Sequence, residues 1–112
     1  MKVVILESPY AGLGASSQDI EKNVEYARAC IRDCLKRGEA PFASHLLYTQ
    51  EGILDDKVPE ERKLGMEAGF AWIPKAEASV VYTDRGISKG MEEGIKRAEE
   101  NGLSVEYRKL YP

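Results

Sequence analysis

The sequence predicts a three-layer α/β domain built on a small parallel sheet. Stretches typical of strands alternate along the chain with stretches typical of helices, and this alternation indicates a parallel sheet with right-handed crossovers. Two strand-like runs, 3–6 and 79–83, are largely apolar and rich in Val, as expected of strands covered on both faces. With 112 residues, the chain is long enough for one such core, and we expect a single domain over 1–112.

The first strand is followed by a loop and a long amphipathic helix. Residues 7–17 end the apolar run with Pro, Gly, Ala and Ser, which predicts a loop. Ser16 and Asp19 have the spacing of a capping box at the start of the helix, and Gly38 is expected to end it. The residues spaced three and four apart that predict its apolar face are Ile20, Val24, Ala27, Ile31, Cys34 and Leu35.

The middle of the chain predicts an edge strand, a helical turn and a second helix. Residues 39–44 contain a proline, which cannot donate to a sheet ladder, so this strand is expected at an edge. A helical turn over 45–50 and a polar loop over 51–57 follow. The second helix is expected to begin at Pro59, because proline suits the first helical turn, and to end before Pro74. Its expected core contacts are Leu64, Phe70, Ala71 and Ile73.

The last third of the chain predicts a buried strand, a third helix and a final strand. The strand at 79–83 leads through a glycine-containing loop into a helix that ends near Gly102. Residues 103–108 alternate apolar and polar side chains, as expected of a strand with one solvated face. Placing the two apolar strands in the centre gives the order 2-1-3-4, a flavodoxin-like sheet. The loops after the first and third strands, 8–17 and 83–90, then diverge at the switch point, where open α/β sheets bind ligands.

Composition and charge argue against several classes of function. The formal net charge is −3, with Lys and Arg scattered among acidic residues, so we expect neither a nucleic-acid polymer nor a membrane as partner. No apolar run has the length of a signal peptide or a membrane span, which favours a cytoplasmic protein. Cys30 and Cys34 lie one helical turn apart and are expected to be buried thiols, because a zinc site needs more ligands than these two and the lone His45. We therefore expect no metal and no cofactor.

Glu92 is the candidate for chemistry. It lies in the first turn of the third helix, between Gly90 and Gly94. A helix N-terminus favours the ionised form of a carboxylate, which is the form that a nucleophile needs. The two glycines are expected to let a substrate approach closely. The alternative is that Glu92 is simply a favourable charge near a helix N-terminus.

The segment around Glu92 resembles a motif of the nucleoside 2-deoxyribosyltransferase superfamily. That superfamily includes deoxyribosyltransferases, deoxynucleoside 5′-monophosphate N-glycosidases and small phage and bacterial relatives. Its G-x-G-[MY]-E-x-G segment aligns with SKGMEEG here, which places Ser88, Gly90, Met91, Glu92 and Gly94 on the motif. The loop 8–12 (SPYAG) is similar to the family's entrance loop, and 41–45 (PFASH) resembles a segment of the small relatives.

The resemblance implies an enzyme that cleaves the base–sugar bond of a nucleoside or nucleotide through a glutamate nucleophile. Glu92 would attack the anomeric carbon through an oxocarbenium-like transition state. Tyr10 would orient Glu92, or would be an ordinary packed aromatic. Asp84 would contact sugar hydroxyls or protonate the leaving base; alternatively, an Asp two residues before a glycine is simply suited to a turn.

The remaining candidate residues are expected to bind the substrate. Ser88 would cap the third helix and, with the amides of 86–90, would bind an anion such as a 5′-phosphate. His45 would act as an acid or base, or would be structural. The full set of expected substrate-binding residues is Ser8, Pro9, Gly12, His45, Gly86, Ser88, Gly90 and Met91.

Two other functions stay open. The same scaffold would also suit a protein that binds a nucleotide in phage–host conflict without turning it over, or a structural domain with a vestigial pocket. An acidic residue that many members of the superfamily carry before the third strand is replaced here by Gly69, which favours binding without catalysis, whereas the intact Gly90, Met91 and Glu92 favour the enzyme. Members of the superfamily often complete their pocket across a dimer interface, so the resemblance implies a homo-oligomer.

Overall fold

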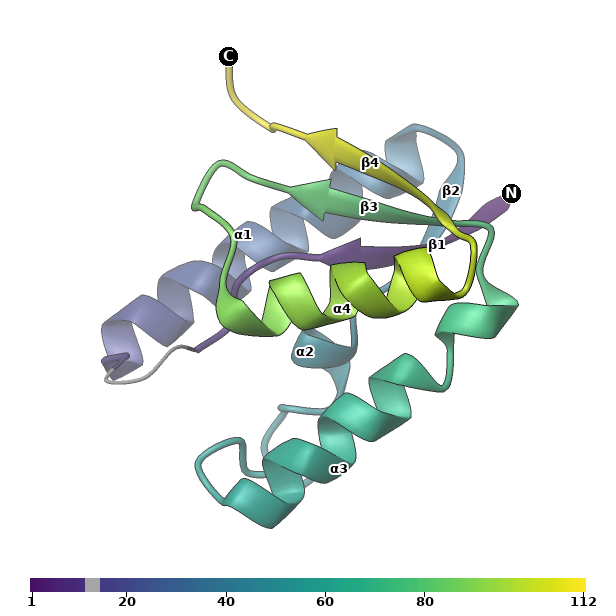
Figure 1. Cartoon of the computed structure of the whole chain (residues 1–112). Coiled ribbons are helices and arrows are strands. Elements are labelled where there is room, and N and C mark those ends of the chain that lie inside the picture. The colour runs from purple at the N-terminus through teal and green to yellow at the C-terminus, as the bar shows by residue number, and fades with distance from the viewer. Residues whose placement is uncertain (12–14) are drawn as a thin grey trace.

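Four parallel strands form the sheet in the order β2-β1-β3-β4 (Figure 1). The structure is a computed structural model that describes residues 1–11 and 15–112. The strands are β1 (Lys2–Glu7), β2 (Glu39–Phe42), β3 (Ala78–Tyr82) and β4 (Ser104–Arg108). The predicted α/β class and the 2-1-3-4 order are therefore confirmed, with the two largely apolar strands in the centre.

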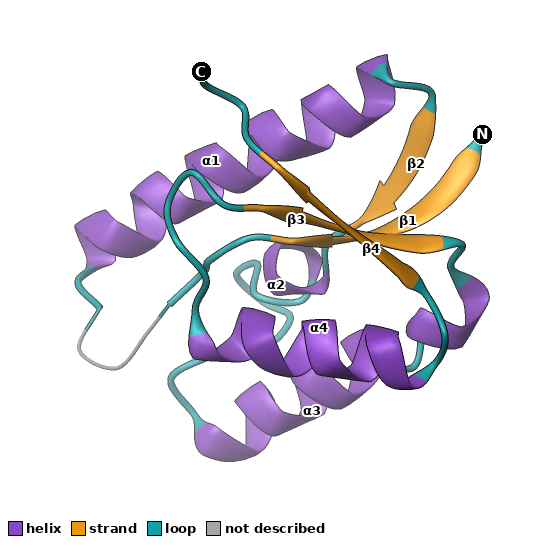
Figure 2. Ribbon diagram, turned by 45° about the horizontal axis from the view of Figure 1, so that its top comes forward, coloured by secondary structure: helices purple, strands orange, loops and turns teal. Residues whose placement is uncertain are grey.

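The helices form a layer on each face of the sheet (Figure 2). Helix α1 (Ser17–Lys36) covers one face, and α4 (Lys89–Glu100) covers the other. Beyond α4 lies α3 (Pro59–Phe70), which packs against the short α2 (Ser44–Leu47) and is followed by a 3-10 turn, η1 (Ile73–Lys75). No helix in the described ranges 1–11 and 15–112 is long and apolar enough to cross a membrane.

Side chains of the central strands alternate between the two faces, as the pleat of a strand requires. Val4 and Leu6 of β1 are buried in one cluster with Tyr26 and Cys30 of α1. The next residues in the alternation, Ile5 and Glu7, therefore point to the opposite face, where they line a cavity under α4. This alternation places a carboxyl group at the carboxyl end of β1.

The helices begin where the sequence predicts. At the start of α1, Ser16 Oγ accepts a hydrogen bond from the Asp19 amide at 3.1 Å, and the Asp19 carboxylate accepts one from the Ser16 amide at 3.1 Å. Pro59 stands in the first turn of α3. Cys30 and Cys34 are buried free thiols.

Two expectations about buried faces are wrong. Leu35 and Leu64 are 51% and 56% exposed. The buried face of α1 is instead centred on Tyr26, Ala27, Cys30 and Cys34. Helix α3 packs on α2 rather than on the sheet, so only Gly69 within α3 is buried. Of the four expected core contacts, Ile73 in the following turn is buried, Phe70 is partly buried, and Ala71 is exposed.

The final strand differs from its predicted alternation. Arg108 is buried and Tyr107 is exposed, although the sequence predicts a solvated polar face. The Arg108 guanidinium donates hydrogen bonds of 2.7 and 2.6 Å to the two carboxylate oxygens of Glu39, at the other edge of the sheet. It also lies 3.2 Å from the Tyr82 hydroxyl. A paired, multiply hydrogen-bonded charge is the form in which arginine is buried.

Candidate functional site

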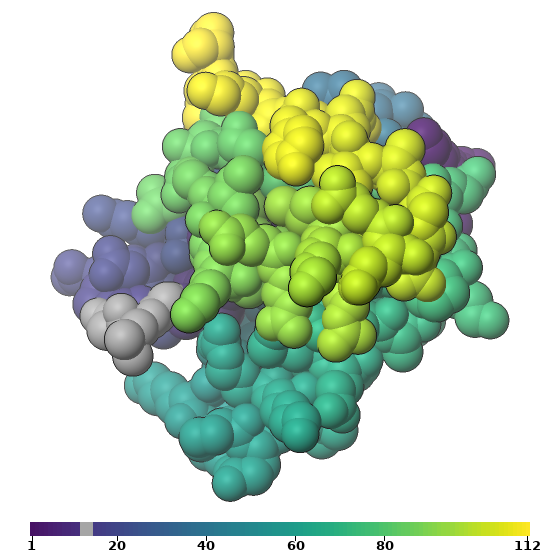
Figure 3. Space-filling view, in the orientation of Figure 1, coloured from purple at the N-terminus to yellow at the C-terminus, as the bar shows by residue number. Residues whose placement is uncertain are grey.

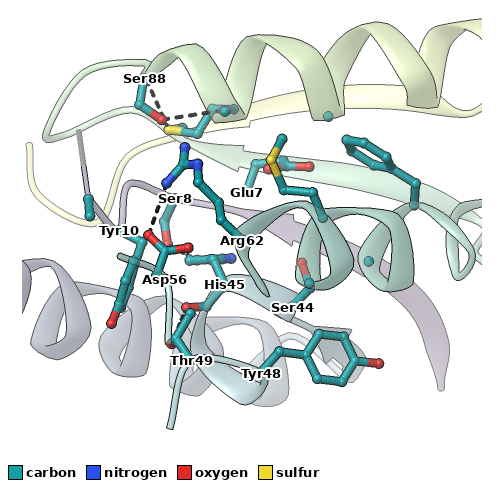
Figure 4. Close-up of a pocket in the computed structure, with 18 of the residues that line it drawn as sticks. Glu7, Ser8, Tyr10, Ser44, His45, Tyr48, Thr49, Asp56, Arg62 and Ser88 are labelled. Atoms are coloured by element: carbon teal, nitrogen blue, oxygen red, sulfur yellow. Dashed lines mark hydrogen bonds and ion pairs between the residues drawn. The ribbon is translucent and has the colours of Figure 1, made fainter. Parts of the chain in front are cut away.

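A cavity of about 110 Å³ lies at the carboxyl edge of the sheet, between β1 and the helices α2, α3 and α4 (Figure 4). This is the edge at which the predicted switch point lies. For comparison, a protein cavity of roughly 150 Å³ holds benzene. The cavity is smaller than that, so it has room for one small ring at most, and the rest of a ligand would lie at its mouth.

Glu7 is the carboxyl group on the inner wall of this cavity. It is the last residue of β1 and is partly buried. Removal from water raises the pKa of Glu7 to about 8, because burial disfavours the charged form of a carboxyl group. At pH 7 the group is therefore mostly a neutral carboxylic acid, able to donate a proton.

Gly94 makes room for this carboxyl group. A Cβ atom added at Gly94 would lie 2.2 Å from Glu7 Oε2 and 2.8 Å from Glu7 Cδ, far inside van der Waals contact. Any side chain at position 94 would occupy the space that the Glu7 carboxyl fills. The expectation that this glycine opens space for a substrate is therefore corrected: it lets helix α4 approach Glu7.

Ser8 and His45 form a hydrogen-bonded pair beside Glu7. The distance from Ser8 Oγ to His45 Nε2 is 2.7 Å, and both residues line the cavity. Burial lowers the pKa of His45 to about 4, so the imidazole is neutral at pH 7. The structure thus brings together two residues that the sequence placed in different segments, and both are uncharged hydrogen-bonding groups.

The mouth of the cavity carries an ion pair. Arg62 of α3 places Nη1 2.9 Å from Asp56 Oδ2, and both side chains line the cavity with Tyr10 and Tyr48. Burial raises the pKa of Asp56, although the neighbouring guanidinium acts in the opposite direction. Tyr10 lies at the cavity, whereas Glu92 borders the outer surface of α4; the expectation that Tyr10 orients Glu92 is therefore corrected.

The start of α4 forms the opposite wall. Ser88, Gly90 and Met91 all line the cavity. The Ser88 hydroxyl caps the helix by accepting a hydrogen bond from the Met91 amide at 3.3 Å, and the Met91 sulfur accepts one from the Ser88 amide at 3.3 Å. These three predicted residues therefore lie at one site with Ser8, Tyr10 and His45.

Glu92 does not face this cavity. It is exposed, and it borders a shallow depression on the outer surface of α4 with Lys89, Glu93, Lys96, Arg97 and Glu100; this outer face of the helix is seen in Figure 3. Met91, Gly94, Ile95 and Ala98 are the buried residues of the helix, and the helical period of 3.6 residues turns Glu92 away from them. The expectation that Glu92 is a nucleophile facing the substrate crevice is wrong for this geometry.

Asp84 is also outside the cavity and has structural partners. Its carboxylate accepts hydrogen bonds from the Tyr26 hydroxyl at 2.5 Å and from the backbone amides of Leu110 and Tyr111 at 2.8 and 3.1 Å. Burial acts to raise the pKa of Asp84, but these hydrogen bonds hold it below its ordinary value. Asp84 therefore ties the loop after β3 to α1 and to the C-terminal segment, and the expected catalytic role is corrected.

The other predicted binding residues are placed as follows. Gly86 adopts a φ of 84° in a turn whose amide donates to the Thr83 carbonyl at 2.9 Å, and it does not line the cavity. Pro9 is buried beside the cavity without lining it. Gly12 lies outside the described residues.

Sequence reasoning missed Glu7, Asp56 and Arg62. Glu7 had a readable signal, because it is a charged residue at the carboxyl end of a fully apolar strand, next to a small-residue loop. Asp56 and Arg62 lie in a polar loop and a charged helix, and no local pattern distinguishes them from solvated charges. Only the packing of α3 beside α2 brings them to the cavity.

Comparison with known proteins agrees with this architecture. A solved structure described as the 2-deoxyribosyltransferase of the psychrotolerant bacterium Bacillus psychrosaccharolyticus resembles the chain with a TM-score of 0.63 at 17% sequence identity, over 96% of this chain and 72% of that chain. At this identity the likeness establishes the fold. No curated protein sequence matches the chain. The model of a family described as "Domain of unknown function (DUF7768)" matches residues 2–108, and the chain therefore belongs to the DUF7768 family.

Proposed function

We propose that the chain cleaves the base–sugar bond of a nucleoside or nucleotide, with Glu7 in place of Glu92 as the reacting carboxyl group. The observation that carries this proposal is the Glu7 side chain inside the cavity, with a pKa of about 8. The fold supports it, since the chain resembles a 2-deoxyribosyltransferase in architecture. The position supports it as well, because ligands of open α/β sheets bind at this edge.

The protonation state of Glu7 favours a general acid rather than a nucleophile. The neutral carboxylic acid donates its proton to a nitrogen of the leaving base as the carbon–nitrogen bond breaks, and the bonding electrons leave with the base. The anomeric carbon becomes oxocarbenium-like, and the Glu7 carboxylate that remains stabilises this positive charge. A water molecule then adds to the anomeric carbon and returns a proton to Glu7.

The neighbouring residues suit the binding of an uncharged ring. Ser8 and His45 supply a neutral donor and acceptor beside Glu7. At the mouth, Tyr10 offers an aromatic face, on which a base can stack. Sugar or base would thus lie against Glu7 while the remainder of the ligand reaches the mouth.

Base release from a panel of nucleosides and nucleotides, followed by chromatography, tests this proposal. Glu7→Gln keeps the shape of the side chain and removes the acidic proton, so we expect release to fall to the background rate. Glu92→Gln is the matched control on the exposed face of α4, and we expect it to retain the wild-type rate. Loss of release in Glu92→Gln with full release in Glu7→Gln would refute the assignment.

A second candidate function is binding without turnover. It is favoured by the neutral, mutually hydrogen-bonded Ser8–His45 pair, which is suited to recognition. A ligand that raises the melting temperature without release of its base, in wild type as in Glu7→Gln, would support this function. We also propose that the chain assembles as a homo-oligomer. Light scattering coupled to size-exclusion chromatography tests this.

A further inference from the structure

We propose that Arg62 binds an anionic group of the ligand, a phosphate above all, and that Asp56 holds the guanidinium in the empty site until the ligand replaces it. This inference deepens the proposed function, because it names a class of ligand for the same cavity. It also assigns a role to an ion pair that the reaction at Glu7 does not use.

The charges around the cavity point to Arg62. It is the one cationic side chain that lines the cavity within the described ranges, whereas Glu7, Asp56 and Glu61 are acidic. The inner groups are neutral at pH 7, because the pKa of Glu7 is raised to about 8 and that of His45 is lowered to about 4. An uncharged ring therefore suits the interior, and among the charged groups at the mouth Arg62 is the one that an anion can bind, once it is released from Asp56.

Most N–H groups of the Arg62 guanidinium are not used by Asp56. Figure 4 shows the Arg62 side chain reaching across the cavity from α3, with Asp56 beside its tip. Among the described residues, the Arg62 guanidinium makes one hydrogen bond, of 2.9 Å from Nη1 to Asp56 Oδ2. A guanidinium presents five N–H groups in a planar fork that fits the oxygens of a phosphate. Most of this fork is available to a ligand.

Asp56 is not needed to hold its own loop. The Asp55 amide donates to Glu61 Oε1 at 2.9 Å, and the Lys57 amide donates to Asp55 Oδ1 at 3.0 Å. The Val58 amide closes the turn on the Asp55 carbonyl at 3.0 Å. These contacts fix the loop through Asp55 and Glu61, so the pair between Asp56 and Arg62 is free to open.

Little free energy is needed to separate Arg62 from Asp56 and pair it with a ligand. The Arg62 side chain is 42% exposed and that of Asp56 is 20% exposed, and ion pairs this accessible to water are weak. A phosphate engages the guanidinium through two charge-assisted hydrogen bonds, which are stronger than a single contact. Asp56 thus competes with the ligand without preventing its binding.

Binding of inorganic phosphate and of a matched nucleoside and nucleoside 5′-monophosphate, measured by isothermal titration calorimetry, tests the proposal. We expect Arg62→Gln to weaken phosphate and nucleotide binding roughly tenfold or more, since a charge-assisted contact is lost, and to leave nucleoside binding unchanged. Asp56→Asn removes the competitor, and we expect phosphate to bind roughly threefold more tightly. Arg62→Lys keeps the charge without the fork and should fall between wild type and Arg62→Gln.

Lys63→Gln is the matched control, because Lys63 is the exposed neighbour of Arg62 on α3 and does not line the cavity. It should leave phosphate affinity unchanged. Equal phosphate affinity in wild type and Arg62→Gln, or weaker affinity in Asp56→Asn, would refute the proposal and indicate a purely structural ion pair. These measurements need no turnover, so anion binding without base release would overturn the glycosidase function alone.

Discussion

Substitution of Gly94 by Ala tests whether the position of the Glu7 carboxyl matters to the reaction. The added Cβ would lie 2.2 Å from Glu7 Oε2, and ordinary contact begins at 3.4 Å, so the carboxyl must move by about 1.2 Å. A misplacement of about 1 Å in a reacting group can lower a rate roughly 100-fold. We therefore expect base release by Gly94→Ala to fall by about that factor.

The stability of the same variant should change little. Ala is favoured over Gly inside a helix by about 1 kcal/mol, and forcing a side chain off its preferred rotamer costs about 0.5–1.5 kcal/mol. These terms oppose each other, so urea denaturation should show a free energy of unfolding within about 1 kcal/mol of wild type. Large loss of activity with unchanged stability is thus the expected signature.

Gly90→Ala is the matched control on the same helix. Position 90 also lines the cavity, but nothing lies within 4 Å of a Cβ added there. The added methyl group leaves Glu7 where it is, so any loss of base release in this variant reports crowding of the substrate alone, and we expect it to be much smaller than the loss in Gly94→Ala. Wild-type base release by Gly94→Ala would refute the reasoning, because the carboxyl would then not need the position in which it lies.

Three further outcomes follow from the buried groups and the helix cap. In the folded protein the pKa of Glu7 is raised from 4.5 to about 8, and the pKa of His45 is lowered from 6.5 to about 4. Between pH 4.5 and 6.5 a rise in pH therefore lowers the free energy of unfolding through Glu7 and raises it through His45. Above that range Glu7 acts alone, so unfolding free energy should fall from pH 6.5 to about 8 in wild type, and this decrease should vanish in Glu7→Gln, as urea titrations at each pH will show. Arg108→Met should cost about 3–5 kcal/mol by urea denaturation, because it leaves the Glu39 carboxylate buried without its partner; an unchanged unfolding midpoint would contradict this. Ser16→Ala should cost about 1 kcal/mol through loss of the α1 cap, measured by the thermal midpoint, with Ser17→Ala as the adjacent control.

Much of the fold could be predicted because each element carries a local signal. Apolar runs marked β1 and β3, and a proline marked β2 as an edge strand. The capping residue Ser16 marked the start of α1. These signals depend on a few neighbouring residues, and they combine into the strand order through general rules of chain connection. The position of the cavity at the switch point follows from that order.

The sequence by itself thus determined the sheet, its order and the edge at which a ligand can bind. Only the tertiary structure decided which carboxyl group faces the cavity. Met91, Ile95 and Ala98 mark the buried face of α4 already in the sequence, at helical spacing, and place Glu92 outside it. The sequence does not show which side chain of another element lies opposite Gly94. Once Met91 and Ile95 are buried, Glu92 must point to solvent, and the space beside Gly94 is filled by Glu7 from β1. Contacts between residues far apart in the chain made this choice, because the packing of Met91 and Ile95 against the sheet brings Gly94 to the strand that carries Glu7.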